Sequence, residues 1–479
     1  MKNVNFPAVN FYRFRQITPD AVLVTLESGE WQILSVEQFS NLKKKNFADE
    51  QFLNLLKDNH IYLTEENWSE FQKNIQKRWS DIFAPPTLHI IVVTPQCNLR
   101  CIYCHAALAQ NDGCAMDIET ANKVLDQIFS VNTDSLTIEL QGGEPVLNFD
   151  LVKYIVLEAK KRAVQTSKSI DLCIVTNFTD VLTDDKIRFL IEHRVDVSTS
   201  LDGPKEVHEN NRNRNYVNGF SVFQERVSTF RRIWRELRND SPRLSAMVTT
   251  TKGLLDKPEE TINTYIDLGF SDLFVRPVNP LGRGENKLTD LEYEPEAFVA
   301  FWGKLIDVLI TKWKSGIHIT EGHLDIILKK LFFYENGYMD LRFPCGAAFG
   351  QRAYGADGKI YTCDEGRMLK EQNFCIGAVT DSHQAIIQNP NGINTFLSSL
   401  AELSACEFCA YKPFCGTCPI LNWKEHPDRN TQTYGGRRCK IYQGMLDYVF
   451  TKFMNDSDAQ EVFGEMLLDR LGDESNADE

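Results

Sequence analysis

Residues 88–104, LHIIVVTPQCNLRCIYC, are the most informative stretch of the chain. The first part, Leu88–Val93, is an apolar and β-branched run of the kind that forms a buried strand. In the loop that follows, Cys97, Cys101 and Cys104 have the spacing C-x3-C-x2-C. Three thiolates can bind three irons of a [4Fe–4S] cube and leave the fourth iron open to another ligand. The alternatives are a zinc ion, with His105 as a fourth ligand, and unrelated buried thiols.

Strand candidates alternate with helical stretches after Thr87. Further apolar or β-branched runs lie at Leu136–Leu140, Leu172–Val175, Asp196–Leu201, Leu244–Thr249 and Leu273–Val278. Helical patterns lie between them at Ile118–Phe129, Leu151–Arg162, Asp184–His193, Val222–Leu237 and Pro258–Leu268. This alternation predicts an α/β fold with a parallel sheet covered by helices. Six units instead of eight indicate an open, partial (β/α)6 barrel, with ligands at the carboxyl ends of its strands.

The pattern divides the chain into four segments. They are a small α+β segment at 1–84, the partial barrel at 85–335, an irregular cysteine-rich segment at 336–450 and an acidic tail at 451–479. The first boundary falls at Ala84-Pro85-Pro86, because neither proline lets a helix continue. The first segment has strand candidates at Ala21–Leu26, Trp31–Leu34 and Ile61–Leu63, and helical stretches at Val36–Leu42 and Asp49–Asn59.

Charge is concentrated at the end of the chain. The net charge is −14, and the last 25 residues contain nine acidic residues and one basic residue, Arg470. We interpret this tail as a disordered, solubilising segment with one short amphipathic turn around Val462–Leu471. The sequence has no basic face of the kind that nucleic-acid binding needs, so we expect no nucleic-acid partner.

Composition places the chain among globular proteins. Hydrophobic residues make up 43% and charged residues 25% of its 479 residues. No run approaches the roughly 18 apolar residues of a membrane span, and the first residues have no signal-peptide pattern. We therefore expect a cytoplasmic protein without a membrane partner. In a reducing compartment, an odd and clustered set of 13 cysteines indicates metal binding before disulfides.

A second group of cysteines lies in the irregular segment. Cys345 and Cys363 flank Gly358, and the run Cys406-x2-Cys409-x5-Cys415-x2-Cys418 is followed by Cys439. Taken alone, the two C-x2-C pairs would suggest a zinc ribbon. A segment with such weak secondary-structure signals is expected to depend on bound metal for its core.

The first cysteine loop and the strand ends that follow it resemble the radical SAM superfamily. Tyr103 is the aromatic residue just before the last cysteine, and Gln141-Gly142-Gly143-Glu144-Pro145 ends the second strand like the GGEP motif of that family. The resemblance implies S-adenosylmethionine as cofactor and a [4Fe–4S] cluster bound by the three cysteines. It also implies that Gly142, Gly143 and Glu144 receive the amino group of the methionine moiety. Glycine permits close backbone approach, and a carboxylate can pair with an ammonium group.

Later strand ends continue this resemblance. It implies that Ser200, and also Asn177, contact the ribose or carboxylate of the cofactor, with Arg212 nearby. Asp202 is as well explained by a turn or helix cap before Pro204 as by a cofactor contact. His208 is interpreted as structural.

The second cysteine group resembles the SPASM extension of radical SAM enzymes, which holds two auxiliary [4Fe–4S] clusters. The resemblance assigns Cys345, Cys363 and Cys418 to one cluster, and Cys406, Cys409, Cys415 and Cys439 to the other. Two residues instead of the usual three separate Cys415 from Cys418, and the first auxiliary cluster lacks an evident fourth ligand. Cys375 is a candidate for that ligand, although a buried inert thiol on a strand, or an open site, would also fit. Cys114 and Cys173 are interpreted as ordinary buried cysteines.

Stretches along most of the chain resemble the HxsB maturases of the His-Xaa-Ser peptide system. They include Leu88–Thr94, Ser198–Pro204 and Asp364–Leu369. The resemblance implies that a 5′-deoxyadenosyl radical abstracts hydrogen from a small ribosomally made precursor peptide. It also implies a low-potential electron donor and a second radical SAM maturase as partners. Residues 1–84 resemble a small, winged-helix-like peptide-recognition element, with a plain packing domain as the alternative.

Two other functions fit the same cysteines. One is an anaerobic sulfatase maturase, which oxidises a cysteine or serine to formylglycine. The other is a non-catalytic iron–sulfur scaffold or electron carrier, which would leave the GGEP-like residues and Ser200 without a purpose.

Overall fold

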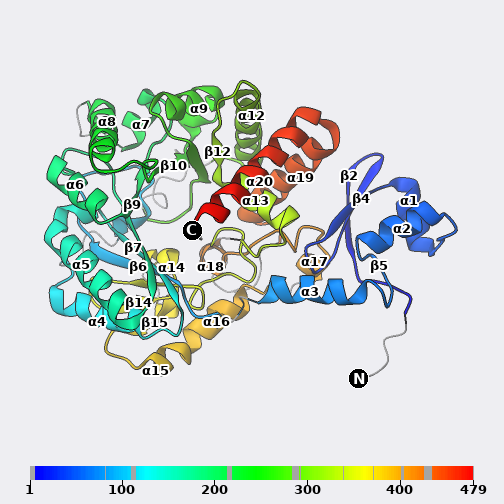
Figure 1. Cartoon of the computed structure of the whole chain (residues 1–479), viewed down its shortest axis with the longest axis horizontal. Coiled ribbons are helices and arrows are strands. Elements are labelled where there is room, and N and C mark those ends of the chain that lie inside the picture. Colours follow the sequence, from blue (N-terminus) through cyan, green and yellow to red (C-terminus); the bar gives the residue numbers. More distant parts are fainter. Residues whose placement is uncertain are drawn as a thin grey trace.

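The computed structural model describes residues 6–80, 82, 84–108, 115–212, 218–282, 291, 293–337, 339–369, 372–400, 404–425 and 434–477. Figure 1 shows the N-terminal elements at one end of the long axis and the barrel helices α4–α8 at the other. Helices α13, α19 and α20 lie between these two ends.

The six predicted strands of the barrel form neighbouring parallel strands of one sheet. They are β6 (Leu88–Thr94), β7 (Ser135–Gly142), β8 (Ser169–Val175), β9 (Val195–Ser200), β10 (Leu244–Thr250) and β11 (Asp272–Pro277). Their spatial order follows the sequence, so every strand ends at the same edge of the sheet. The α/β fold with a parallel sheet is confirmed.

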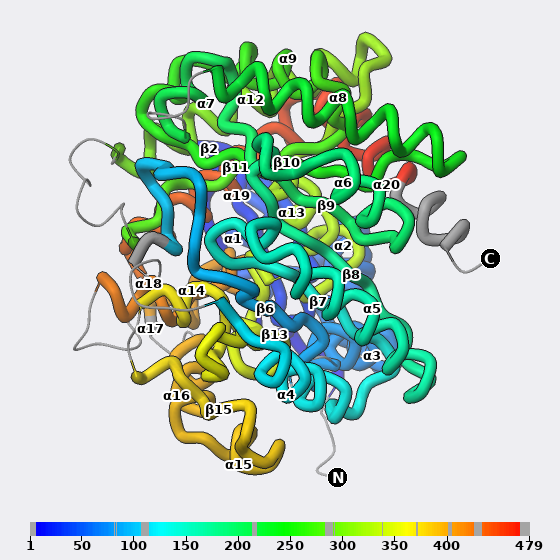
Figure 2. Tube along the Cα trace, turned by 90° about the vertical axis from the view of Figure 1, so that its left-hand side faces the viewer, coloured from blue at the N-terminus to red at the C-terminus, as the bar shows by residue number. Residues whose placement is uncertain are grey.

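The sheet continues beyond the six predicted strands. The two-residue strand β12 (Thr320–Glu321) pairs with β11, and β13 (Gln351–Tyr354) runs parallel to β6. The antiparallel strands β14 (Lys359–Tyr361) and β15 (Cys375–Ala378) complete a ten-stranded sheet. Figure 2 shows β6 and β13 side by side. The cysteine-rich segment is therefore joined to the barrel through backbone hydrogen bonds.

The helices of the barrel cover the sheet with their apolar faces. They are α4 (Ile118–Phe129), α5 (Phe149–Thr166), α6 (Asp184–Glu192), α7 (Lys205–Arg212), α8 (Gly219–Leu237), α9 (Pro258–Asp267), α12 (Pro295–Lys314) and α13 (Gly322–Phe332). In α4, Ala121, Val124, Leu125 and Ile128 recur with helical spacing and are all buried in the main core. The side chain of Asp117 caps this helix by accepting a hydrogen bond from the Thr120 N–H.

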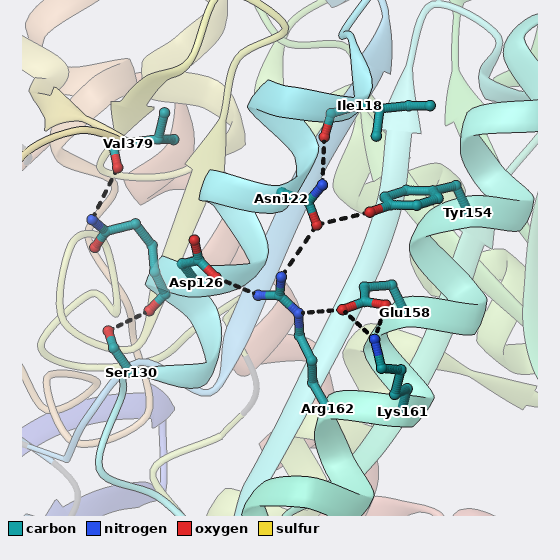
Figure 3. A network of polar contacts seen from close by, with 10 residues as sticks. Ile118, Asn122, Asp126, Ser130, Tyr154, Glu158, Lys161, Arg162 and Val379 are labelled. Carbon is teal, nitrogen blue, oxygen red and sulfur yellow. Dashed lines mark hydrogen bonds and ion pairs between the residues drawn. The ribbon is translucent and has the colours of Figure 1, made fainter.

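A polar network links α4 and α5 on their solvent side (Figure 3). The Arg162 guanidinium donates to Asp126 over 2.6 Å, to Glu158 over 3.0 Å and to Asn122 over 3.2 Å. The Tyr154 hydroxyl donates to the Asn122 side-chain oxygen over 2.8 Å. The network holds two neighbouring helices in register outside the core.

The N-terminal segment is a small α+β unit. Strands β2 (Arg13–Thr18), β3 (Ala21–Thr25) and β4 (Trp31–Ser35) form an antiparallel sheet, and β1 (Ala8–Val9) pairs with β5 (Tyr62–Leu63). The helices are α1 (Val36–Lys44), α2 (Glu50–Asp58) and α3 (Trp68–Trp79). The sequence did not indicate β2 or α3, because each buries an arginine, Arg13 or Arg78, where an apolar residue would be expected.

The rest of the cysteine-rich segment consists of short helices. They are α14 (Asp364–Met368), α15 (His383–Ile387), α16 (Pro390–Ser398), α17 (Ser404–Glu407) and α18 (Pro419–Glu425), followed by the long α19 (Arg437–Asn455).

The acidic tail differs from its expected disorder. Residues Ser457–Ala477 form helix α20, and Ala459, Val462, Phe463 and Met466 are buried in the main core. These side chains form a narrow apolar stripe on an otherwise acidic helix. Burial of this stripe stabilises the helix by more than the repulsion between its acidic residues destabilises it. Among the described residues, no helix combines the length and apolar character that crossing a lipid bilayer requires.

Candidate functional site

The three cysteines of the first loop gather at the carboxyl end of β6. Cys101 is buried, Cys97 and Cys104 are half-buried, and the three pack in one small cluster with Tyr103. The Ile102 N–H donates to the Asn211 carbonyl over 2.9 Å, which anchors the loop to α7. Burial raises the pKa of the Cys97 thiol to about 11 and that of Cys101 to about 12. Three thiols grouped at one strand end fit the ligand set of an iron–sulfur cluster, whose irons would stabilise their thiolates.

The end of β7 lies directly against this loop. The Gly143 N–H donates to the Thr94 carbonyl and the Glu144 N–H to the Gln96 carbonyl, both over 2.8 Å. A Cβ on Gly142 would stand 2.2 Å from the Thr94 carbonyl oxygen, and one on Gly143 would stand 2.3 Å from that of Gln96. Any larger residue would push the two strand ends apart, so both glycines are required by the approach of the cysteine loop.

Glu144 is held by the next strand end. Its carboxylate accepts hydrogen bonds from the Thr176 hydroxyl and the Asn177 N–H, both over 2.8 Å, and from the Val146 N–H over 3.2 Å. The side chain is buried, and burial raises its pKa to about 7 despite these hydrogen bonds. A carboxylate in this position would gain from a positively charged or hydrogen-bonding ligand.

Asn177 connects the third strand end to the cysteine loop. Its amide donates to the Asn98 side-chain oxygen over 2.8 Å and lies 4.0 Å from the Cys97 sulfur. Ser200 ends β9, and both residues line the same cavity.

Tyr103, Asp202 and Arg212 form a buried polar triad. The Tyr103 hydroxyl lies 2.7 and 2.9 Å from the two carboxylate oxygens of Asp202 and accepts a hydrogen bond from Arg212 over 2.8 Å. Asp202 is fully buried and its carboxylate lies 3.9 Å from the Arg212 Nη1, so it acts as a counter-ion within this triad. Within the described part of the chain, the buried Arg212 Nε has no hydrogen-bond partner. His208 packs against Phe220 and Phe223, as expected for a structural residue.

One cavity of about 670 Å³ joins these strand ends to the cysteine-rich segment. On the barrel side it is lined by Cys97, Cys101, Tyr103, Cys104, Gly143, Glu144, Asn177, Ser200 and Arg212. On the opposite side it is lined by Cys345, Cys363 and Cys418. Its volume lies in the range of ligand-binding pockets, so it can hold a cofactor with part of a substrate. The donor set, the glycine contacts and the unpartnered Arg212 nitrogen all fit an iron–sulfur cluster with S-adenosylmethionine beside it.

Cys345, Cys363 and Cys418 pack in one cluster of side chains with Phe374 and Ile420. Burial raises the pKa of Cys345 to about 12 and that of Cys418 to about 11. The Gly366 N–H donates to the Cys363 sulfur over 3.3 Å. The structure therefore brings together the three thiols assigned to the first auxiliary cluster.

The other four cysteines meet in a separate, smaller pocket. Cys406, Cys409, Cys415 and Cys439 line it, with Cys418 at the boundary to the large cavity. Burial and the neighbouring thiols Cys439, Cys409 and Cys406 raise the pKa of Cys415. The two sets of thiols thus lie side by side.

The remaining cysteines occupy different places. Cys375 lies on β15, lines neither pocket, and directs its sulfur at the Gly377 carbonyl over 3.5 Å. Cys173 lies on β8 and contributes to the wall of the large cavity, so its thiol faces the barrel interior. Cys114 lies outside the described residues.

Several charged residues of the cavity wall were not predicted as site residues from the sequence. Arg276 at the end of β11 forms an ion pair with Asp340, and Arg438 donates to the Asn279 side chain over 3.2 Å. Asp364 pairs with Arg367 over 2.6 Å, and Glu365 also lines the cavity. A charged residue at the end of a barrel strand was the available signal for Arg276. The others come from segments that only the folded chain brings to the cavity.

Comparisons with known proteins agree with this geometry. Residues 91–265 match the model of the Radical SAM superfamily. The chain is 22% identical over 380 residues to the cysteine-type anaerobic sulfatase-maturating enzyme of Clostridium perfringens strain 13, and the match covers 78% of this chain and 98% of that enzyme. It is 25% identical over 311 residues to the serine-type enzyme of Bacteroides thetaiotaomicron, covering 59% and 70%.

Two solved structures have the same fold. Native anSMEcpe with bound AdoMet has a TM-score of 0.66 and 18% identity, and the match covers 78% of this chain and 100% of that one. Streptococcus suis SuiB bound to precursor peptide SuiA has a TM-score of 0.55 and 12% identity, covering 90% and 99%.

Proposed function

Residues 91–265 belong to the radical SAM superfamily, and from this we propose that the chain post-translationally modifies a ribosomally made peptide. The observation that carries the proposal is the shared cavity, in which the cofactor-binding strand ends face the thiols of Cys345, Cys363 and Cys418. A peptide side chain placed between them would touch both. Because the family consists of enzymes, this match argues against the alternative of a non-catalytic iron–sulfur scaffold or electron carrier.

The residues of the barrel would hold the cofactors. Cys97, Cys101 and Cys104 would bind a [4Fe–4S] cluster, and Gly142, Gly143 and Glu144 would receive the amino group of S-adenosylmethionine. Asn177, Ser200 and Arg212 would hold the rest of the cofactor, with Tyr103 fixing Arg212. With an electron from a low-potential donor, the bound cluster and S-adenosylmethionine would supply radical chemistry that removes a hydrogen atom from the substrate.

The cysteine-rich segment would hold two auxiliary [4Fe–4S] clusters. Cys345, Cys363 and Cys418 would bind the first, at the wall of the substrate cavity. Cys406, Cys409, Cys415 and Cys439 would bind the second, in the adjoining pocket. Cys375 is a poor fourth ligand for the first cluster, because it lines neither pocket.

A precursor peptide is favoured by the extent of the two structural matches. The match to SuiB covers 90% of this chain, whereas the match to native anSMEcpe covers 78%. Solved SuiB carries a precursor peptide. The N-terminal unit, with its three-stranded sheet and three helices, supports a peptide-recognition role because a peptide could add a strand to a sheet edge. The resemblance to HxsB maturases points the same way, with a second radical SAM maturase and a low-potential electron donor as partners.

Formylglycine formation is the second candidate. It is favoured by the sequence match that spans 98% of the cysteine-type sulfatase-maturating enzyme of Clostridium perfringens. That reaction also acts on a cysteine or serine of a polypeptide, so the same cavity would serve.

Co-expression without oxygen distinguishes the two candidates. The enzyme is produced with a small peptide encoded beside its gene or, separately, with a sulfatase-derived peptide that carries the target cysteine. A discrete mass change in the first peptide, absent when Cys97, Cys101 and Cys104 are replaced by alanine, supports peptide maturation. A change only in the sulfatase peptide supports formylglycine formation. If wild-type protein releases no 5′-deoxyadenosine, both candidates fail.

A further inference from the structure

Two buried basic side chains lie in the interior without a carboxylate partner among the residues that the structure describes. Lys330 on α13 is fully buried, and its ammonium donates to the backbone carbonyls of Asn336 and Leu341. Arg78 on α3 is 2% exposed, and it donates through Nη2 to the Pro413 carbonyl. Its Nε and Nη1 atoms are buried with no hydrogen-bond partner within the described part of the chain. Neither side chain forms an ion pair with any carboxylate that the structure describes.

Both cations approach one segment from different parts of the molecule. Arg78 comes from the N-terminal unit and contacts Pro413, two residues before Cys415. Lys330 comes from the barrel and holds Leu341, whose backbone packs against Gly416. A Cβ on Gly416 would stand 2.5 Å from the Leu341 carbonyl carbon. Cys415, between these two contacts, lines the pocket of four thiols.

This arrangement is unfavourable unless an anion is present. A buried charge without a partner is strongly unfavourable, and the cost grows when a like charge is near. Burial lowers the pKa of Lys330, and the neighbouring Arg78 lowers it further, whereas the Cys415 thiolate raises it. Burial likewise lowers the pKa of Arg78, to about 10. The charge of Glu27 partly offsets the effect on Arg78, but Glu27 itself pairs with Arg13 over 2.6 Å, so the described carboxylates leave both cations without an ion-pair partner.

We propose that Lys330 and Arg78 are positioning residues whose charge balances an anionic iron–sulfur cluster bound by Cys406, Cys409, Cys415 and Cys439, and raises its reduction potential. The inference rests on the proposed function, which assigns a cluster to these four thiols. A cube with four thiolate ligands is negatively charged and becomes more so on reduction. Nearby positive charge therefore favours the reduced form, as charge around a cluster generally tunes its potential. Because Arg78 belongs to the N-terminal unit, this contact would also link that unit to the cluster.

Substitutions at Lys330 separate charge from hydrogen bonding. Lys330→Gln keeps donors for the two carbonyls and removes the charge, whereas Lys330→Arg keeps the charge. The matched control is Lys329→Gln, one residue earlier on the same helix, where the lysine pairs with Asp325 over 3.3 Å and is partly exposed. Potentials of all clusters are measured by EPR-monitored redox titration of the reconstituted full chain. The signal that is lost in Cys439→Ser identifies the second auxiliary cluster.

We expect Lys330→Gln to shift this one signal to a more negative potential by at least tenfold in the one-electron equilibrium, about 59 mV. Lys330→Arg should restore it, and Lys329→Gln should leave it unchanged. Arg78→Gln should shift the same signal in the same direction. An unaltered potential in Lys330→Gln, with the cluster retained, would overturn the inference, as would an equal shift of all clusters.

For a variant that loses the cluster and therefore gives no EPR signal, the thermal unfolding midpoint provides the test. Removing an unbalanced charge should leave the cluster-free protein equally or more stable, and should reduce the stabilisation that cluster loading gives. A variant that is destabilised equally with and without the cluster contradicts the inference. It would mean that Lys330 only stabilises the backbone through its hydrogen bonds to the two carbonyls. Wild-type protein with only about four irons per chain would instead overturn the proposed auxiliary clusters themselves.

Discussion

Glu144 is a buried carboxylate that its own chain holds from three sides. Thr176, Asn177 and Val146 fix its orientation, so it can receive a ligand group without losing side-chain entropy on binding. Burial raises its pKa to about 7, so the carboxyl changes charge near neutral pH. A ligand that prefers the ionised form must bind more weakly in acid.

We predict that Glu144→Gln weakens S-adenosylmethionine binding by roughly ten- to hundredfold. The reason is the loss of a charge-assisted hydrogen bond, which contributes about 1.5–3 kcal/mol. Wild-type affinity should rise between about pH 6 and pH 7.5 as the carboxyl ionises, and the variant should show no such rise. Anaerobic isothermal titration calorimetry measures both quantities. Equal pH slopes in the two proteins would remove Glu144 from the binding site.

His60 and Glu30 form a buried ion pair in the N-terminal unit, with Nδ1 and Oε1 2.5 Å apart. Burial lowers the pKa of His60, but the hydrogen bond to Glu30 and the charges of Glu30 and Glu70 outweigh it and raise the pKa overall. The stabilisation is therefore complete below the unfolded pKa of about 6.5 and is lost as pH rises through the higher folded value.

His60→Gln should consequently destabilise the protein by about 3 kcal/mol in mild acid and by less at about pH 9. Thermal unfolding midpoints at the two pH values give the comparison. His193→Gln is the control, because burial lowers the pKa of His193 and the pH dependence should have the opposite sign. A His60 effect that does not change with pH would mean that the pair is not ionic.

At the scale of elements, periodicity identified the barrel well. The helix α4 begins and ends at the predicted residues, because its apolar stripe follows the helical repeat without interruption. The helix α20 was missed because its apolar positions are few among many acidic ones. The acidic composition reflects the exposed surface of this helix. The opposite face, which includes Val462, Phe463 and Met466, packs on α12, α13 and α19.

Phe463→Ala should therefore destabilise the fold by about 3–5 kcal/mol, as expected for removing a buried aromatic side chain. Leu468→Ala, on the same helix but 67% exposed, should change the unfolding midpoint very little. Chemical denaturation of both variants provides the test. If both variants changed the stability equally and only slightly, α20 would be a tail that the fold does not need.

At the scale of the whole molecule, the N-terminal unit is joined to the cysteine-rich segment by buried polar contacts. Arg13 donates to the Glu407 carbonyl over 2.6 Å and pairs with its carboxylate over 3.0 Å, and the Thr25 hydroxyl donates to the Ala410 carbonyl over 2.8 Å. These contacts surround Cys406 and Cys409. Removing residues 1–84 would disturb the second cysteine pocket, so substitutions on the surface of the unit are the better test of peptide binding.

Iron content tests the three cysteine groups together. Anaerobically reconstituted protein should contain about 12 irons per chain, as three cubes require. Replacing Cys409 and Cys439 by alanine should lower this to about eight, and Cys375→Ala should leave it unchanged because Cys375 lines neither pocket. Colorimetric iron assay and the EPR spectrum give the answer. Loss of iron in Cys375→Ala would make it the missing ligand.

Local sequence was sufficient for the positions of the six parallel strands, the first cysteine loop and the GGEP-like turn. Alternation of strands and helices depends on near neighbours in the chain, and the motif residues follow strands whose carboxyl ends must meet. Long-range packing was needed for everything that joins distant segments: the parallel pairing of β13 with β6, the shared wall of the cavity, the triad of Tyr103, Asp202 and Arg212, and the buried position of Lys330. Spacing along the chain carries no information on such contacts, because a buried charge or a short strand is stabilised by partners that only the folded chain brings near.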